Sequence, residues 1–134
     1  WRPLALLVLD TGISTIAPVA RALDGMAGAF HIKVHDGPRY REAVSRLQTQ
    51  PYGSHADEME TSRMLALAPS RVDMARAAAS PAGPFDGPLT RLNAPSGSYG
   101  DPTLATFEKG RILLDAMVAD LIAAARDAKT AAQR

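Results

Sequence analysis

The fold is decided by the stretch Leu4-Ala5-Leu6-Leu7-Val8-Leu9 and by the turn residues Asp10-Thr11-Gly12 that follow it. A continuous apolar run between Pro3 and Asp10 is typical of a strand buried on both faces of a parallel sheet. The run is too short to span a bilayer. We therefore expect a core strand at the beginning of the chain.

The pattern of a strand followed by a helix occurs twice. The first helix is predicted to be capped by Ser14 or Thr15 and to end at Gly25 and Gly28. It carries apolar residues on one face, at Ile16, Val19, Ala20 and Leu23. Residues 30–34 read as a second strand, and Asp36-Gly37-Pro38 leads into a short amphipathic helix with Tyr40, Ala43, Val44 and Leu47 on one side. Two successive units of this kind predict parallel pairing through right-handed crossovers.

The second half of the chain is predicted to be helical at both ends with a long loop between. One helix begins near Ala56 and ends near Ala68-Pro69, and a short strand or buried segment is expected at Val72 and Met74. Residues 79–101 are rich in proline and glycine, which excludes regular structure. Asp101 is a natural N-cap with Pro102 at the first position of a final amphipathic helix. Its expected apolar face contains Leu104, Phe107, Leu114, Met117, Val118, Leu121, Ile122 and Ala125, and fraying is expected after Ala128.

Composition limits the classes of function. The 134 residues fit one domain, and 46% hydrophobic with 22% charged residues are values of a globular protein. The net charge of +1 and only seven aromatic residues argue against nucleic acid and anionic membranes as partners. The absence of cysteine excludes disulfides and thiolate chemistry. The compartment stays open, with the cytoplasm as the default.

The stretch from Ser54 to Ser62 contains one histidine and three carboxylates within six residues. One interpretation is a helix start, in which Ser54 and Asp57 form a capping box and the acids favour the helix dipole. The other is a site for metal binding or proton transfer, because His55 could turn back over the same turn as Glu60. The residues alone leave both open.

Two motifs resemble the creatininase (creatinine amidohydrolase) family. The first is His55-Ala56-Asp57-Glu58-Met59-Glu60-Thr61-Ser62, and the second, about forty residues later, is Tyr99-Gly100-Asp101-Pro102 with Ala105-Thr106 and Lys109-Gly110. The resemblance implies a three-layer α/β/α fold with a mostly parallel sheet, assembled as a homo-oligomer, commonly a hexamer. It also implies two divalent metal ions, zinc or manganese, that hydrolyse a C–N amide bond in a small and often cyclic substrate.

The resemblance also assigns roles to residues. His55 corresponds to the catalytic acid/base histidine and Glu60 to a glutamate that ligates or supports a metal. Tyr99 and Asp101 would line the substrate pocket, although Asp101 is also explained as a helix cap. Asp57 and Glu58 stand at variable positions of the family motif and are expected to be supporting or surface residues.

The departures from the family pattern are equally informative. Gly12 stands where many members have a metal-binding histidine, and the N-terminal ligand motifs of the family have no counterpart here. Residues 1–134 are therefore expected to be the C-terminal part of a longer creatininase-like domain. A non-catalytic binding or assembly module with a degenerate metal site is the alternative. The other histidines, His31 and His35, are expected at the ends of an ordinary strand.

Overall fold

A computed structural model describes residues 5–80, 87–88 and 90–133 of the chain. The chain divides into two compact units, one spanning Trp1–Glu42 and Ala116–Arg134 and the other spanning Ala43–Asp115. Each unit is described by itself. Among the described residues, no helix combines the length and apolar character needed to cross a membrane. The expectation of a single domain stays a prediction.

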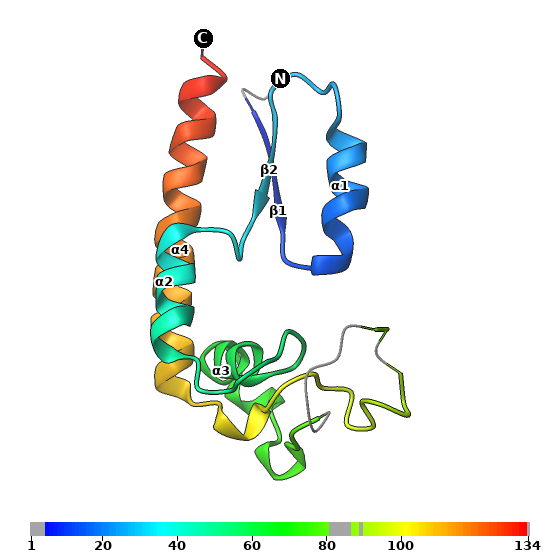
Figure 1. Cartoon of the computed structure of the whole chain (residues 1–134). Coiled ribbons are helices and arrows are strands. Elements are labelled where there is room, and N and C mark those ends of the chain that lie inside the picture. The colour runs from blue at the N-terminus through cyan, green and yellow to red at the C-terminus, as the bar shows by residue number, and fades with distance from the viewer. Residues whose placement is uncertain (1–4, 81–86, 89, 134) are drawn as a thin grey trace. The chain divides into compact units, whose positions relative to one another are not determined.

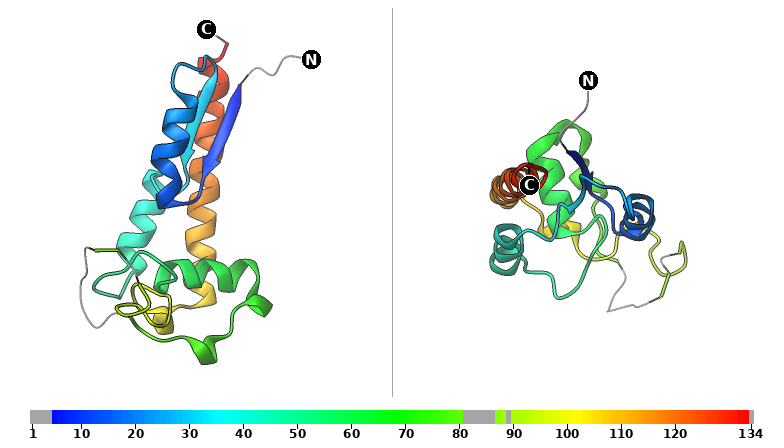
Figure 2. Two further views of the ribbon diagram at one scale, coloured as in Figure 1. Left: turned by 90° about the vertical axis from the view of Figure 1, so that its right-hand side faces the viewer. Right: turned by 90° about the horizontal axis from the view of Figure 1, so that it is seen from above.

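The first unit contains a two-stranded parallel sheet. Strand β1 (Leu6–Asp10) pairs with β2 (Ala29–Lys33) in a register that places Leu6 beside Ala29 and Asp10 beside Lys33. The short η1 (Ile13–Thr15) and helix α1 (Ile16–Leu23) connect the strands. Figures 1 and 2 show α1 on one face of this sheet and the C-terminal part of α4 on the other. The predicted α/β class, the parallel pairing and the three layers are confirmed.

The prediction that the first strand is buried on both faces is wrong. Leu6, Leu7 and Leu9 expose 46%, 37% and 53% of their surface, whereas Asp10 is buried. The physical reason is that β2 is the one strand paired with β1 among the described residues. Apolar residues in a parallel strand are buried only where the sheet continues and helices cover both faces.

Helix α2 (Pro38–Leu47) begins where the Asp36-Gly37-Pro38 turn predicts. Its N-terminus is capped from a distant part of the chain. Asp120 accepts hydrogen bonds from the backbone N–H of Tyr40 at 2.9 Å and from Nη1 of Arg39 at 3.1 Å. A side chain at Gly37 would collide with the Asp120 carboxylate. This tertiary cap stabilises the exposed amides at the start of α2.

The second unit contains α3 (Glu58–Leu67), followed by η2 (Pro69–Arg71) and η3 (Met74–Arg76). The helix lies as predicted, but the expected strand near Met74 is a 3-10 turn capped by Asp73. The predicted capping box is also corrected. The cap is Asp57, whose carboxylate accepts the N–H of Glu60 at 2.9 Å, rather than Ser54.

The final helix is interrupted near its predicted start. Asp101 caps only η4 (Pro102–Leu104), and α4 (Phe107–Ala131) begins after Thr106. The Thr106 hydroxyl oxygen accepts the N–H of Lys109 at 3.1 Å and so provides the cap that the sequence pattern placed at Asp101. At its other end α4 continues three residues past Ala128, the position after which fraying was expected.

The buried stripe of α4 is rotated from the predicted apolar face. Leu113, Met117, Asp120 and Ala128 are buried, whereas Val118 and Ile122 expose 52% and 47% of their surface. The apolar face predicted from hydrophobic periodicity is wrong here, because the Asp120 carboxylate is buried through its hydrogen bonds to α2. Near the start of α4, a side chain at Gly110 would overlap the backbone carbonyl of Ser62, so only glycine permits this close approach to α3.

Candidate active site

The structure brings the two sequence motifs together through their backbones. The N–H of Tyr99 donates to the carbonyl of His55 at 2.7 Å, and the Tyr99 carbonyl accepts the N–H of Ser54 at 2.9 Å and that of His55 at 3.3 Å. The pair forms a local antiparallel bridge in the second unit. Residues separated by more than forty positions in the sequence therefore lie directly side by side.

The backbone between His55 and the helix cap is strained. Ala56 has a φ of +45°, a left-handed conformation that costs a residue with a Cβ about 1 kcal/mol. Its N–H donates to Oε2 of Glu60 at 2.7 Å. The Glu60 side chain of α3 thus holds this turn, and the turn connects the bridge at His55 to the helix cap at Asp57.

His55 and Glu60 face one another across this turn. Nδ1 of His55 lies 3.8 Å from Oε2 of Glu60, an ion-pair distance that is longer than a hydrogen bond. Oε1 of Glu60 lies 3.6 Å from Nη2 of Arg63. The His55 side chain is 61% exposed and that of Glu60 is 37% exposed, so both can reach a small molecule. The helix start is confirmed by the cap at Asp57, and His55 lies beside Glu60, but a role in metal binding or proton transfer stays a prediction.

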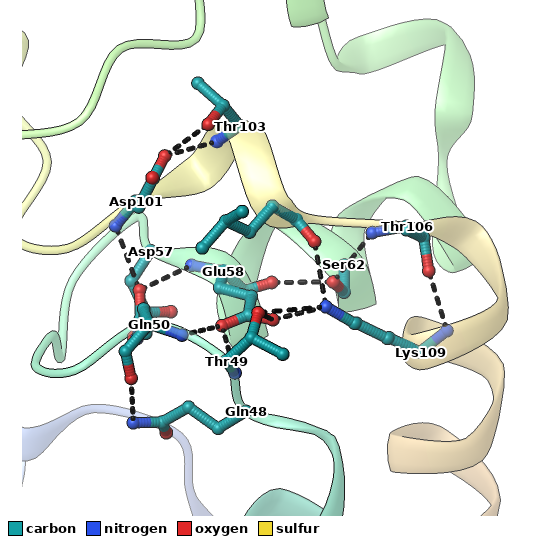
Figure 3. A network of polar contacts seen from close by, with 11 residues as sticks. Gln48, Thr49, Gln50, Asp57, Glu58, Ser62, Asp101, Thr103, Thr106 and Lys109 are labelled. Atoms are coloured by element: carbon teal, nitrogen blue, oxygen red, sulfur yellow. Dashed lines mark hydrogen bonds and ion pairs between the residues drawn. The ribbon is translucent and has the colours of Figure 1, made fainter.

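Glu58 is the most buried charged residue of this region, which corrects the expectation that it is a supporting or surface residue. Its exposed surface is 0%. The carboxylate accepts hydrogen bonds from the N–H of Thr49 at 2.8 Å, from the Thr49 hydroxyl at 2.7 Å and from the N–H of Gln50 at 2.7 Å. It also pairs with the ammonium group of Lys109 (Figure 3). Lys109 belongs to the second motif, so this ion pair links α3 to α4.

The surroundings of Glu58 favour its ionised form. Burial alone would raise the pKa of Glu58, but the hydrogen bonds from Lys109, Gln50 and Thr49 outweigh burial and lower the pKa below its ordinary value of 4.5. The carboxylate is therefore an anion at neutral pH. Sequence reasoning missed its importance because a glutamate in the first turn of a helix is ordinarily a surface residue.

Gln50 extends this network towards the loop that carries Tyr99. Its Oε1 accepts the N–H of Glu58 at 3.2 Å and the N–H of Asp101 at 2.9 Å, while Nε2 donates to Oδ2 of Asp57 at 2.7 Å (Figure 3). Gln50 and Asp57 are both buried. A buried amide with satisfied donors and acceptors fixes its neighbours firmly. No signal in the sequence pointed to Gln50.

The two predicted substrate-binding residues have different surroundings. The Asp101 carboxylate accepts hydrogen bonds from the N–H and the hydroxyl of Thr103, at 3.0 and 2.5 Å, which agrees with its role as a cap. The ring of Tyr99 lies 5.8 Å from the ring of Tyr52, centre to centre. Their roles towards a substrate stay predictions.

The other two histidines lie in the first unit. His31 is the middle residue of β2, not its end as expected, and its Nε2 lies 2.8 Å from Oδ2 of Asp10. The hydroxyl of Thr15 also donates to Asp10, which lowers the Asp10 pKa, and so replaces the helix-capping bond predicted for Thr15. His35 follows the strand and packs its ring 5.5 Å from that of Tyr40.

The described residues do not form a metal centre by themselves. Within residues 5–80, 87–88 and 90–133, no three histidine, aspartate or glutamate side chains converge in a geometry that could hold a metal ion. A two-metal site needs about six to eight protein ligand positions. His55 and Glu60 supply at most two, and Gly12 supplies none.

Comparison with known families identifies one match. The sequence profile of the creatininase family, described as creatinine amidohydrolase, matches residues 13–125. The matched region contains both motifs and most of the described secondary structure. A search of curated proteins gives no match.

Solved structures share the fold at low sequence identity. A mutant creatininase complexed with creatine is 22% identical with a TM-score of 0.67, and the match covers 92% of this chain and 56% of that chain. A creatininase structure designated Mn is also 22% identical, with a TM-score of 0.66 and coverage of 91% and 55%. A proposed creatinine amidohydrolase of Bacteroides fragilis NCTC 9343 is 23% identical, with a TM-score of 0.65 and coverage of 96% and 54%. This chain spans about half the length of the structures it resembles.

The buried Glu58 carboxylate should make the stability of the fold sensitive to acid. A pKa below 4.5 in the folded state means that this stabilisation is complete above pH 4.5 and is lost as the pH falls through the folded pKa. Glu58→Gln should lower the free energy of unfolding at pH 7 by about 1–3 kcal/mol, because a charge-assisted network loses its anion. Urea unfolding at pH 7, 5 and 3.5 measures both effects.

The matched control for this experiment is Glu108→Gln, at an exposed position of α4. It should change stability by no more than about 0.5 kcal/mol. If Glu58→Gln and the control show the same dependence on pH, Glu58 does not contribute to acid sensitivity.

Proposed function

Because this chain belongs to the creatinine amidohydrolase family, we propose that it contributes the proton-transfer half of a metal-dependent amidohydrolase site. The reaction is hydrolysis of a C–N amide bond in a small substrate, of the kind that creatinine contains. The observation that carries the proposal is the meeting of the two motifs, in which His55 is fixed by backbone bonds to Tyr99 and stands beside Glu60.

His55 is suited to transfer a proton by its chemistry and its position. An imidazole has two ring nitrogens that can each accept or donate a proton, so it can take a proton from one group and give it to another within a reaction cycle. The side chain is exposed to solvent, while its backbone is held on both sides by Tyr99. In amide hydrolysis the departing nitrogen needs a proton, and we assign that transfer to His55.

Glu60 is assigned to hold the histidine and, in an assembled site, to face a metal. Its Oε2 lies on the Nδ1 side of the imidazole and accepts the N–H of Ala56. A carboxylate in that position favours a proton on Nδ1 and directs Nε2 towards the substrate. Arg63 holds the other carboxylate oxygen at 3.6 Å.

The metal ions of such a site require ligands beyond those of this chain. When bound, a pair of divalent ions supplies a hydroxide nucleophile and polarises the amide carbonyl. The described residues do not fit a complete centre. We therefore place the remaining ligands on polypeptide that corresponds to the other half of the related structures, in the same protein or in another subunit of a homo-oligomer.

The second candidate function is a binding or assembly module without catalysis. It is favoured because the Glu60 carboxylate already accepts a hydrogen bond from Ala56 and lies 3.6 Å from Arg63, so both of its oxygens have partners before any metal is bound. Metal analysis of an assembled protein containing this chain separates the candidates. Fewer than one divalent ion per chain together with no amidase activity would favour the module.

Removal of the imidazole should abolish hydrolysis without unfolding the chain. In the assembled, metal-loaded enzyme, His55→Ala should reduce kcat for creatinine or another cyclic amide by about 100-fold or more, the usual contribution of a positioned acid/base. Because the side chain is 61% exposed, the melting temperature should change little. His35→Ala, which removes an imidazole from the first unit, is the control and should retain activity. Full activity in His55→Ala would remove this residue from the mechanism.

Metal binding by residues 1–134 alone should fall short of a two-metal centre. Titration of the metal-free chain with zinc or manganese, followed by dialysis and elemental analysis, should give fewer than two ions per chain, because too few ligands converge among the residues that the structure describes. Stoichiometric retention of two ions would contradict this expectation.

A further inference from the structure

The first unit contains a cavity that the proposed hydrolytic site does not use. Its volume is about 470 Å³, and it lies between the end of β2, the turn at residues 36–38 and residues 120–127 of α4. Its apolar lining residues include Ile32, Val34, Leu121, Ala123 and Ala124. A cavity of this volume with an apolar wall and a few polar groups is typical of a small-molecule site.

His31 lines this cavity and is held in a defined state by Asp10. Nε2 of His31 lies 2.8 Å from the Asp10 carboxylate, which is itself fixed by the hydroxyl of Thr15 and by the N–H of Gly12 at 3.2 Å. Asp10 is buried, with 2% of its side chain exposed. A carboxylate beside Nε2 retains the proton there, so in the neutral ring Nδ1 is an acceptor. Nδ1 has no partner within the part of the chain that the structure describes.

The charged groups of the cavity favour a cation. Its lining residues include three acids, Asp36, Asp120 and Asp127, and one base, Lys33. Asp120 is occupied by its bonds to α2, and Asp36 lies 3.6 Å from Lys33. Asp127 is exposed and makes no hydrogen bond or ion pair with the other described residues. Among the lining residues, the Asp127 carboxylate and Nδ1 of His31 are therefore acceptors that remain available to an N–H donor.

We propose that this cavity binds a small organic ammonium ion whose apolar part contacts Ile32, Leu121 and Ala124. The N–H groups of the ligand donate to Asp127 and to His31, and Asp10 keeps the imidazole in the accepting tautomer. The cavity is formed by residues of the first unit, whereas His55 belongs to the second unit, and the binding proposed here does not depend on hydrolysis. It would bind an amine whether or not the chain contributes to an enzyme.

The test uses n-butylammonium chloride as the probe and NMR of the isotope-labelled chain as the readout. The amides of Ala123 and Ala124 and the Nδ1 resonance of His31 should shift saturably with n-butylammonium. Sodium butyrate and n-butanol at the same concentrations are the matched controls and should produce no saturable shift. The proposal would be overturned if butyrate and n-butylammonium produced equal shifts. It would also be overturned if the shifts with n-butylammonium did not saturate by 100 mM, which is roughly the weakest binding of interest.

Three variants test the assignment of residues. Asp127→Asn should weaken binding by about threefold to tenfold, because a charge-assisted hydrogen bond becomes neutral. Ala124→Leu should abolish binding by filling the cavity. Asp115→Asn removes a carboxylate from an exposed position elsewhere on α4 and should leave the affinity unchanged. If the Asp127 and Asp115 variants bind alike, or if the His31 ring does not respond to the amine, the assigned contacts are wrong.

Discussion

The ion pair between Glu58 and Lys109 is the interaction on which the second unit depends. Placing a carboxylate where it has no exposed surface costs several kcal/mol unless its charge and its lone pairs are satisfied. Here four donors from three residues surround it, and they come from the segment before the first motif and from the start of α4. The Glu58 carboxylate therefore holds together residues 49–50, the start of α3 and the start of α4.

This constraint explains how an exposed histidine can be held in a defined position. Gln50 is fixed by its bonds to Glu58 and Asp57 and in turn holds the N–H of Asp101. Asp101 is two residues beyond Tyr99, whose backbone pairs with His55. The strained conformation of Ala56 can persist because the bridge lies on one side of it and the helix cap on the other. Buried polar groups thus determine the geometry of a site whose own side chains face solvent.

Much of the fold could be predicted from the sequence because it follows local patterns. The strand-helix alternation, the turn at Asp36-Gly37-Pro38 and the helix after Asp57 depend on short-range signals. The errors share a different cause. Asp120, Glu58 and Gln50 are buried because of partners distant in sequence, and no periodicity of apolar residues reports such partners. The exposure of Leu7 and Leu9 also depends on which strands lie beside β1, which a local pattern does not encode.

The candidate site was predictable only in part for the same reason. His55 and Glu60 attract attention because a histidine and carboxylates rarely stand so close in sequence, and both belong to the motif that resembles the family. Their connection to Tyr99 requires an antiparallel bridge that neither segment predicts alone. The residues that hold the site, Gln50 and Lys109, have ordinary sequence surroundings and become significant only through the buried anion.

Native-state hydrogen exchange tests the central role of Glu58 most directly. Comparison of the unaltered chain with Glu58→Gln, under conditions in which both are folded, measures the protection of individual amides. In Glu58→Gln we expect the N–H groups of Thr49 and Gln50, which bond the carboxylate, to lose protection, and the N–H of Tyr99 at the His55 bridge to lose protection with them. Unchanged protection at Tyr99 would show that His55 is positioned independently of the buried ion pair and would contradict the account.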